Sequence, residues 1–435
     1  MPIPLAERES MTTQDNSSTW LTAKRLHAHG TILLVCLWSL YIWNLATPGL
    51  RDRAGNLKGT DFLHFYTLGC LARAHDGPAL YDMNAQAALA AQRVPQAAGI
   101  RYLPLYPPQV SIFFAPFAYF SYPVALAIWW SLCASIYGVC CFSVWRTCPN
   151  LQPHGALVFL LAAAFPAFFH LIAWGQTSAL ALLCFTAAFH FLRTGHDRKQ
   201  RDFVAGLCLG CLVFKPQLGL ATAVLFWALL RWKVVAGAII SAAIQLSIGI
   251  LYYGGEPLRR WWGSLRHINE LLPLLEPKPY QTHTLRTFWS MLLPWPAASL
   301  ALYIITSGLV LYFLRACWSR DFVPFSLKYS ALLLATVLIA PHLTVYDLVV
   351  LAPALLLLTD LVIGQAATSE TRALATLLYS VYALPLIGPF ARWTHVQLSV
   401  IAMFATIFLI WRTGVDRGGD RKRGHVNLVS TAGLG

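Results

Sequence analysis

Long apolar runs recur along almost the whole chain. Residues 30–47, 123–145 and 234–253 are each close to the roughly 20 residues that an α-helix needs to cross a bilayer. The sequence is 57% hydrophobic and only 11% charged. Lipid leaves a spanning chain only helices or a closed barrel, and these runs lack the alternation of barrel strands. The sequence therefore predicts an all-α polytopic membrane protein.

Basic residues in short segments orient the predicted helices. Residues 1–29 are polar and place Lys24 and Arg25 directly before the first apolar run, as in an uncleaved signal anchor with a cytoplasmic N-terminus. The loop 193–201 and the tail 412–435 are also basic, and the positive-inside rule places both in the cytoplasm. These assignments predict a transmembrane domain over residues 30–411 with about 12 crossings.

The same topology puts two long polar segments on the outer face. The first, residues 50–122, should carry short helices, and its apolar part 109–122 is short for a crossing and contains Pro116. The second, residues 254–296, has five basic and three acidic residues. This excess of positive charge breaks the positive-inside rule unless it serves an anionic ligand.

One apolar run, residues 203–230, is interrupted by Lys215 and Pro216. Proline disfavours the helical conformation at the preceding residue, and broken helices are tolerated in membranes where they line a polar cavity. We therefore expect two short helices that meet at this point rather than one long helix with Lys215 at mid-membrane.

Polar residues from four parts of the chain then meet at the outer membrane boundary. They are Asp61, Gln176 in the turn 174–177, Lys215, and the segment 342–347. Ionisable groups at membrane depth are costly, and they are usually paired or functional. Basic loops alone define the predicted orientation, so the convergence of these polar residues on one side is independent of it.

Each of these residues also has a plainer interpretation. The Lys215 side chain could reach water from within the membrane, and Gln176 or His342 could satisfy a helix end. Asp347 could be a second acid, a metal ligand or an ion-pair partner of Lys215, and we favour the ion pair.

The residue types suit transfer of a sugar from a polyprenyl phosphate. Such a reaction needs a carboxylate to take the proton of the acceptor hydroxyl, and cations or strong donors to hold the departing phosphate. Asp61 is the candidate catalytic base. The candidate substrate-binding residues are His64, Tyr66, Arg101, Gln176, Lys215, His342 and Asp347.

Other classes of chemistry lack their motifs. The sequence has no P-loop, no dinucleotide-binding fingerprint, no zinc-protease motif and no Asp-x-Asp pair. We therefore expect an activated lipid rather than a nucleotide as the energy source and no cofactor, with a divalent metal left open. Much of the net charge of +14 lies in short loops and the tail, where orientation and anionic membrane lipids explain it, so no nucleic-acid partner is expected.

Several short motifs, taken in order, resemble glycosyltransferase family 87. They are Thr60-Asp61-Phe62 through Gly69, Leu80-Tyr81-Asp82, Tyr106-Pro107-Pro108, Gly175-Gln176, Phe214-Lys215-Pro216, and Pro341-His342 followed by Tyr346-Asp347. The family belongs to the GT-C superfamily of polytopic enzymes that use polyprenyl-phosphate sugars, and its best-known members are mannosyltransferases.

The resemblance implies inverting transfer of a hexose, mannose above all, from a polyprenyl-phosphate donor to a lipid or glycan acceptor. The active site would face the periplasmic or extracellular side of a bacterial cytoplasmic membrane and serve the cell envelope. In this resemblance Asp61 falls at the position of the general base, and Lys215 and His342 fall near the donor phosphate.

Two other functions stay open at this point. A polytopic transporter or lipid flippase for envelope precursors also fits 12 crossings with a Lys and an Asp at membrane depth, and a third option is a non-catalytic partner in polysaccharide assembly. A transporter would hold its charges near the bilayer midplane, whereas the enzyme needs Asp61 beside Lys215 and His342.

Overall fold

The structure, a computed structural model, describes residues 21–193, 198–276, 278–366 and 368–431. Within these ranges the chain is helical, and its only β-type pairings are two isolated bridges. The predicted all-α polytopic membrane fold is confirmed. Part of the N-terminal tail (1–20), part of the basic loop (194–197) and the last four residues of the tail (432–435) lie outside the described residues.

Among the described residues, six helical segments are long and apolar enough to cross a membrane. They are α2 (Ala23–Leu45), α6 (Tyr122–Trp145), α12 (Trp232–Tyr253), α16 (Pro296–Trp318), Val345–Ile363 and Ser369–Thr394. A seventh crossing would combine the segment Gln152–Ala163, which includes α7 (Gly155–Ala163), with α8 (Pro166–Trp174), and the two are bent by 44° at the break between them. Because α2 begins at Ala23, Lys24 and Arg25 lie in its first turn.

Shorter apolar helices occupy most of the other predicted crossings. They are α9 (Ser178–Arg193), α11 (Pro216–Ala228), α17 (Phe325–Ile339) and the first part of α21 (Leu398–Thr431). A crossing made by so short a helix is below the usual length for a bilayer. The total of 12 crossings therefore stays a prediction.

The side chains of α6 show how such a helix is placed. Large apolar residues are exposed at positions 124, 128, 132, 139 and 142, which lie three, four or seven residues apart and so follow one helical face. The opposite face, which includes Trp129, is buried in the protein. An exposed apolar stripe of this kind is the face that lipid would cover. By contrast α17 is buried from Tyr329 to Ile339 and lies within the bundle.

The helix break predicted at Lys215 is confirmed. Helix α10 (Arg198–Gly210) continues into the 3-10 turn η5 (Cys211–Phe214), and α11 begins at Pro216. Lys215 itself has φ −134° and ψ 68°, outside the helical region, because Pro216 disfavours the helical conformation at the residue before it.

Helix α10 packs directly against the backbone of α12. A Cβ atom added at Gly206 would lie 2.1 Å from the Val234 carbonyl oxygen, and one added at Gly210 would lie 2.3 Å from that of Ala238. Small residues permit this close approach of two membrane helices.

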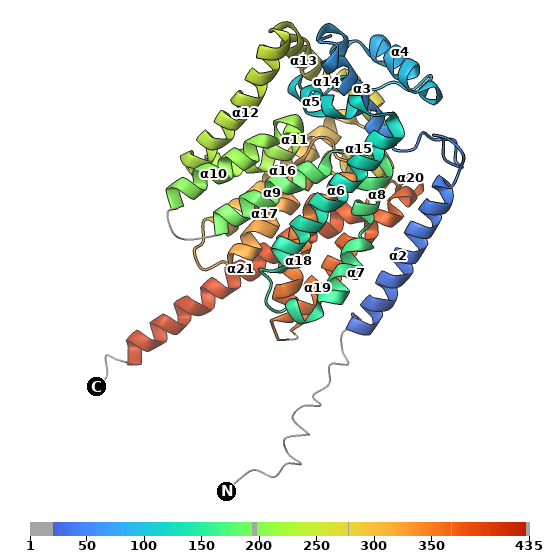
Figure 1. Cartoon of the computed structure of the whole chain (residues 1–435). Coiled ribbons are helices and arrows are strands. Elements are labelled where there is room, and N and C mark those ends of the chain that lie inside the picture. The colour runs from blue at the N-terminus through green and yellow to red at the C-terminus, as the bar shows by residue number, and fades with distance from the viewer. Residues whose placement is uncertain (1–20, 194–197, 277, 367, 432–435) are drawn as a thin grey trace.

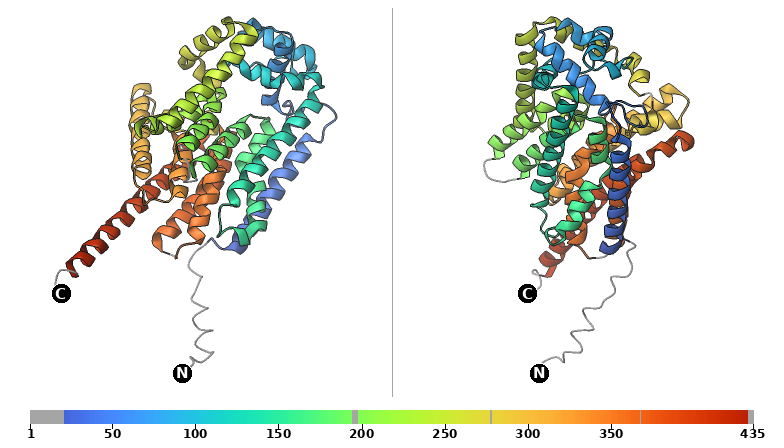
Figure 2. Two further views of the ribbon diagram at one scale, coloured as in Figure 1. Left: turned by 60° about the vertical axis from the view of Figure 1, so that its left-hand side comes forward. Right: turned by 45° about the vertical axis from the view of Figure 1, so that its right-hand side comes forward.

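The two long polar segments gather at one end of the bundle. Figure 1 shows α3 (Thr60–Arg73), α4 (Met83–Arg93), α5 (Gln109–Phe114) and α13 (Glu256–Arg266) at the upper end. In all three views the start of α2 and the end of α21 point the opposite way (Figures 1 and 2).

The apolar part of the first segment divides into α5 and η3 (Ala115–Tyr119), with Pro116 at the start of η3. The remaining elements are short: η1 (Pro78–Tyr81), η2 (Pro95–Ala97), η4 (Gln152–His154), α14 (Ile268–Leu275), η6 (Pro279–Gln281) and α15 (Leu285–Leu292). Near the C-terminal end, η7 (Val345–Leu351) leads into α18 (Ala352–Ile363), and α19 (Ser369–Ala383) is followed by η8 (Leu384–Phe390) and α20 (Ala391–Thr394).

Candidate active site

Two glycines in left-handed conformations bring Asp61 to the turn that carries Gln176. Gly59, with φ +66°, precedes α3, and Gly175, with φ +71°, ends α8. A Cβ atom added at Gly175 would lie 2.7 Å from the Cβ atom of Phe62, the neighbour of Asp61. Glycine is needed at both positions because residues with a side chain rarely adopt this backbone conformation.

A chain of hydrogen bonds links Asp61 to Lys215 through Gln176. The Gln176 Nε2 donates to Asp61 Oδ2 at 2.6 Å, and its Oε1 lies 3.4 Å from Lys215 Nζ. The Thr177 backbone N–H also donates to Gln176 Oε1, at 3.2 Å. These donors hold the amide with its N–H groups toward Asp61. We name Asp61, Gln176, Ser178, Lys215 and Asp347 the central network.

Lys215 forms a buried ion pair with Asp347. Its Nζ lies 2.7 Å from Asp347 Oδ1 and 3.0 Å from Ser178 Oγ, and Ser178 donates to the same carboxylate oxygen at 2.5 Å. Lys215 is 4% exposed and Asp347 3%. The Asp347 Oδ2 accepts from the Thr344 backbone N–H at 3.3 Å, which completes a capping box at the start of η7. This is the pairing that the sequence favoured for Asp347.

The surroundings of Asp61 favour its protonated form more than water does. Burial raises the pKa of the Asp61 carboxyl to about 6, and the charge of Asp347 acts in the same direction. The hydrogen bond from Gln176 and the charge of Lys215 oppose this shift. A carboxyl with a pKa near neutrality is suited to general base catalysis, because it is ionised at neutral pH yet still basic enough to accept a proton.

Among the described residues, three of the predicted substrate-binding residues form no hydrogen bond with the central network. The His64 ring is buried between Tyr102 and Tyr106, at centroid distances of 4.8 and 5.6 Å, and burial lowers the pKa of this imidazole to about 3. The Tyr66 hydroxyl donates to the Phe120 carbonyl at 2.9 Å. Arg101 is exposed. Their roles in substrate binding stay predictions.

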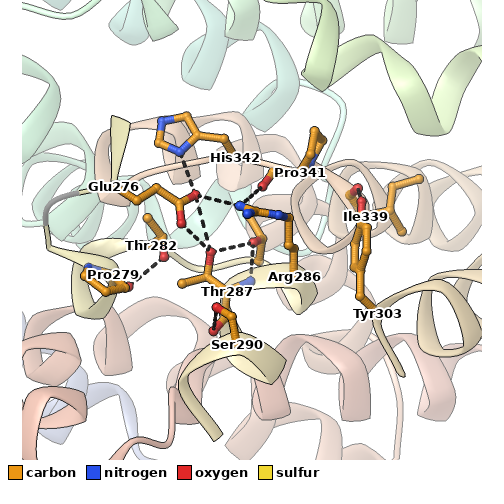
Figure 3. Close-up of polar contacts among 11 residues, drawn as sticks. Glu276, Pro279, Thr282, Arg286, Thr287, Ser290, Tyr303, Ile339, Pro341 and His342 are labelled. Atoms are coloured by element: carbon orange, nitrogen blue, oxygen red, sulfur yellow. Dashed lines mark hydrogen bonds and ion pairs between the residues drawn. The ribbon is translucent and has the colours of Figure 1, made fainter. Parts of the chain in front are cut away.

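His342 belongs to a second polar cluster rather than to the central network. Its Nδ1 lies 2.8 Å from Glu276 Oε1, which is also 3.5 Å from an Nη atom of Arg286 (Figure 3). The Thr287 hydroxyl donates to Glu276 Oε2 at 3.3 Å, and Arg286 donates to the Pro341 carbonyl at 3.3 Å. We name Glu276, Arg286, Thr287 and His342 the Glu276 cluster.

The Glu276 cluster fixes the second long segment against the residues that follow α17. The backbone supports this contact, since Thr282 and Thr344 form an isolated bridge and the His283 N–H donates to the Leu343 carbonyl at 3.3 Å. The Thr344 backbone N–H also donates to the carboxylate of Asp347, which belongs to the central network. The two clusters are therefore connected through the short segment 341–347.

Sequence reasoning missed Ser178 and Glu276. Ser178 lies two positions after Gln176, and its place at the start of a predicted membrane helix was a signal that could have identified it. Glu276 is one of only three acidic residues in a basic segment, but nothing local in the sequence indicates that His342 is its partner. Among the described residues, no group of three or more His, Cys, Asp or Glu side chains gathers as a metal site.

The fold and these clusters define a polytopic α-helical membrane protein with a buried polar site toward one end of its bundle. The sequence model of glycosyltransferase family 87 matches residues 105–341, which is more than half of the 435 residues. The chain belongs to this family, and the protein is therefore a membrane glycosyltransferase. Comparisons with curated proteins and with solved structures find no match.

The matched range does not cover the whole site. It contains Gln176, Lys215 and Glu276, whereas Asp61, His342 and Asp347 lie outside it. The family assignment therefore rests on the central part of the chain, and the link from there to Asp61 rests on the hydrogen bonds of Gln176.

Proposed function

We propose that the protein transfers a sugar from a polyprenyl-phosphate donor to a lipid or glycan acceptor, with Asp61 as the catalytic base. The observation that carries this proposal is the hydrogen bond between Gln176 and Asp61. It links a carboxyl from the first polar segment to a lysine at a break in the membrane helices. Mannose is the sugar that the family resemblance favours, and the site would lie on the outer face of a bacterial cytoplasmic membrane.

Asp61 is arranged to accept one proton. Gln176 donates a hydrogen bond to Oδ2 of Asp61, while Oδ1 accepts no hydrogen bond from the described residues. We therefore assign Oδ1 to the acceptor hydroxyl. As Oδ1 takes this proton, the hydroxyl oxygen bonds to C1 of the sugar. The bond between C1 and the phosphate oxygen breaks at the same time, and the polyprenyl phosphate leaves with the electron pair. Attack opposite the leaving group inverts C1.

Lys215 acts in this proposal as a positioning residue. An ammonium group has three N–H donors, and the three neighbours of Lys215 are Asp347 Oδ1, Ser178 Oγ and Gln176 Oε1. These contacts use all three donors, so none remains to bind a phosphate. Lys215 instead orients the Gln176 amide and, through it, Asp61.

The donor phosphate then needs cations from elsewhere, and the Glu276 cluster supplies candidates. With Asp61 and Asp347 ionised and Lys215 protonated, the central network carries one net negative charge, which disfavours a phosphate beside it. Arg286 lies in α15 and His342 in the segment that follows α17, and both contact the carboxylate of Glu276. We assign the departing phosphate to this side of the site.

Sugar transfer by the purified full-length protein tests the proposal. The assay uses labelled polyprenyl-phosphate mannose in lipid nanodiscs with a membrane lipid extract as acceptor source, and it compares wild type with Asp61→Asn. Loss of a general base lowers turnover by about 10²- to 10⁴-fold. The matched control is Asp321→Asn, an exposed carboxylate between α16 and α17, which should leave turnover unchanged.

Two results would contradict the proposal in different ways. Equal turnover by wild type and Asp61→Asn would remove Asp61 from the mechanism. Transfer from a nucleotide sugar but not from the lipid-linked sugar would overturn the donor class and leave the role of Asp61 intact.

A further inference from the structure

Helix α3 presents polar side chains on two different faces. Tyr66 and Arg73 lie 5 and 12 positions after Asp61, which at 100° per residue places both about 120–140° around the helix from it. Asp61 faces the central network, whereas Tyr66 and Arg73 face the segment that leads into α6. The second face of α3 is therefore directed away from the central network.

An open pocket of about 430 Å³ lies on this second face. Its lining comes from α3, the end of α4 and the residues around the start of α6, and it includes Tyr66, Arg73, Arg93, Tyr119 and Tyr122. The described residues that line it include two arginines and no carboxylate. The pocket therefore presents positive charge that none of its described lining residues neutralises.

The two guanidinium groups are accessible to a ligand. Arg73 donates one N–H to the Ala118 carbonyl at 2.7 Å, and its guanidinium lies 3.8 Å from the centre of the Tyr119 ring. These contacts fix the plane of the group and leave other N–H donors for a ligand. Arg93 is exposed, and within the described residues neither arginine has a salt bridge.

The position of the pocket points to a lipid as its ligand. It adjoins the first residues of α6, one of the helices long enough to cross the membrane. Tyr119 and Phe120 in its rim are 72% and 47% exposed, and the exposed apolar stripe of α6 begins at Val124, 47% exposed. Exposed aromatic rings beside the start of an apolar helix are typical of the membrane interface, at the level of lipid headgroups.

We propose that Arg73 and Arg93 bind the phosphate of an anionic phospholipid of the bilayer, with its acyl chains along the exposed face of α6. Arginine is well matched to phosphate because its planar N–H groups bind two oxygens at once. The described lining residues offer no carboxylate to receive the ammonium of a zwitterionic headgroup, so phosphatidylglycerol fits better than phosphatidylcholine.

Lipid binding to the full-length protein in detergent micelles, measured by native mass spectrometry, tests this site. Phosphatidylglycerol is the probe and phosphatidylcholine the comparison. Wild type is expected to prefer phosphatidylglycerol, and Arg93→Gln should weaken its binding about fivefold, as expected for about 1 kcal/mol per basic residue near anionic lipid. The control Arg259→Gln removes an exposed arginine from α13, outside the pocket, and should leave binding unchanged.

Further measurements distinguish phospholipid binding at this site from an effect of misfolding and from binding of a substrate. Arg73→Lys keeps the charge but loses the paired N–H geometry, and should weaken binding less than Arg73→Gln. Equal affinity for the two lipids, or unchanged binding in Arg93→Gln, would overturn the proposal. Tighter binding of polyprenyl phosphate than of phosphatidylglycerol, with the same dependence on Arg93, would overturn it in favour of a substrate site. The assay contains no sugar donor, so its outcome does not depend on the proposed catalytic mechanism.

Discussion

Lys215 and Asp347 lie 132 positions apart in the chain, yet their Nζ and Oδ1 atoms are 2.7 Å apart in a site that excludes solvent. Breaking a buried ion pair by removing one partner costs about 3–5 kcal/mol, since it leaves one charge without compensation. Replacing both partners with apolar groups is often close to neutral. The pair thus predicts a specific pattern of stability and activity.

The single variants Lys215→Met and Asp347→Leu should each unfold at clearly lower temperature than wild type, and the double variant should recover most of this loss. Sugar transfer should stay low in the double variant, because Gln176 no longer has its lysine partner. Thermal unfolding in micelles and turnover are measured on the same samples. Additive destabilisation in the double variant would contradict the ion-pair interpretation.

The pH dependence of activity should follow Asp61. Its pKa, raised by burial to about 6, predicts that kcat/KM falls about tenfold per pH unit below pH 6 and reaches a plateau above it.

The raised pKa of Asp61 also affects how the stability of the protein depends on pH. A carboxyl whose pKa is higher in the folded state contributes stability at low pH that is lost as the pH rises through about 6. Asp61→Asn should therefore be at least as stable as wild type at pH 7, and marked unfolding of this variant would contradict the shift.

Gln176 should control the protonation of Asp61 without taking part in the chemistry. Gln176→Ala removes the hydrogen bond that lowers the pKa of Asp61, so the midpoint of the pH–rate profile should move upward and turnover at pH 7 should decrease. Gln176→Glu should be more damaging, because it places a second carboxylate beside the first. Pre-steady-state kinetics across pH 5–8 measure this midpoint. An unchanged midpoint in Gln176→Ala would show that Gln176 only fills space.

The sequence predicted the residues of the central network better than those of the Glu276 cluster, and the difference has physical reasons. The break at Lys215 follows from the local effect of Pro216, and the positive-inside rule then constrains the end at which Gln176 and Asp347 lie. Tyr66 lies five helical positions after Asp61 and therefore on another face of α3, so closeness in the sequence does not bring the two side chains together. The pairing of Glu276 with His342 joins a loop to a distant segment, and no periodicity in the sequence encodes such a contact.

The Glu276 cluster makes a last prediction, which bears on how the donor enters. Glu276 occupies Arg286 and His342, the groups that we assign to the donor phosphate, so its carboxylate and the phosphate compete for the same donors. Glu276→Gln removes the competing charge and should lower KM for the lipid-linked sugar about threefold to tenfold, the effect of roughly 1 kcal/mol from a partly exposed pair. The matched control is Glu256→Gln, whose exposed pair with Arg260 lies within α13. A raised KM with a lower unfolding temperature would show instead that Glu276 mainly anchors the second segment, and the phosphate would then have to bind elsewhere.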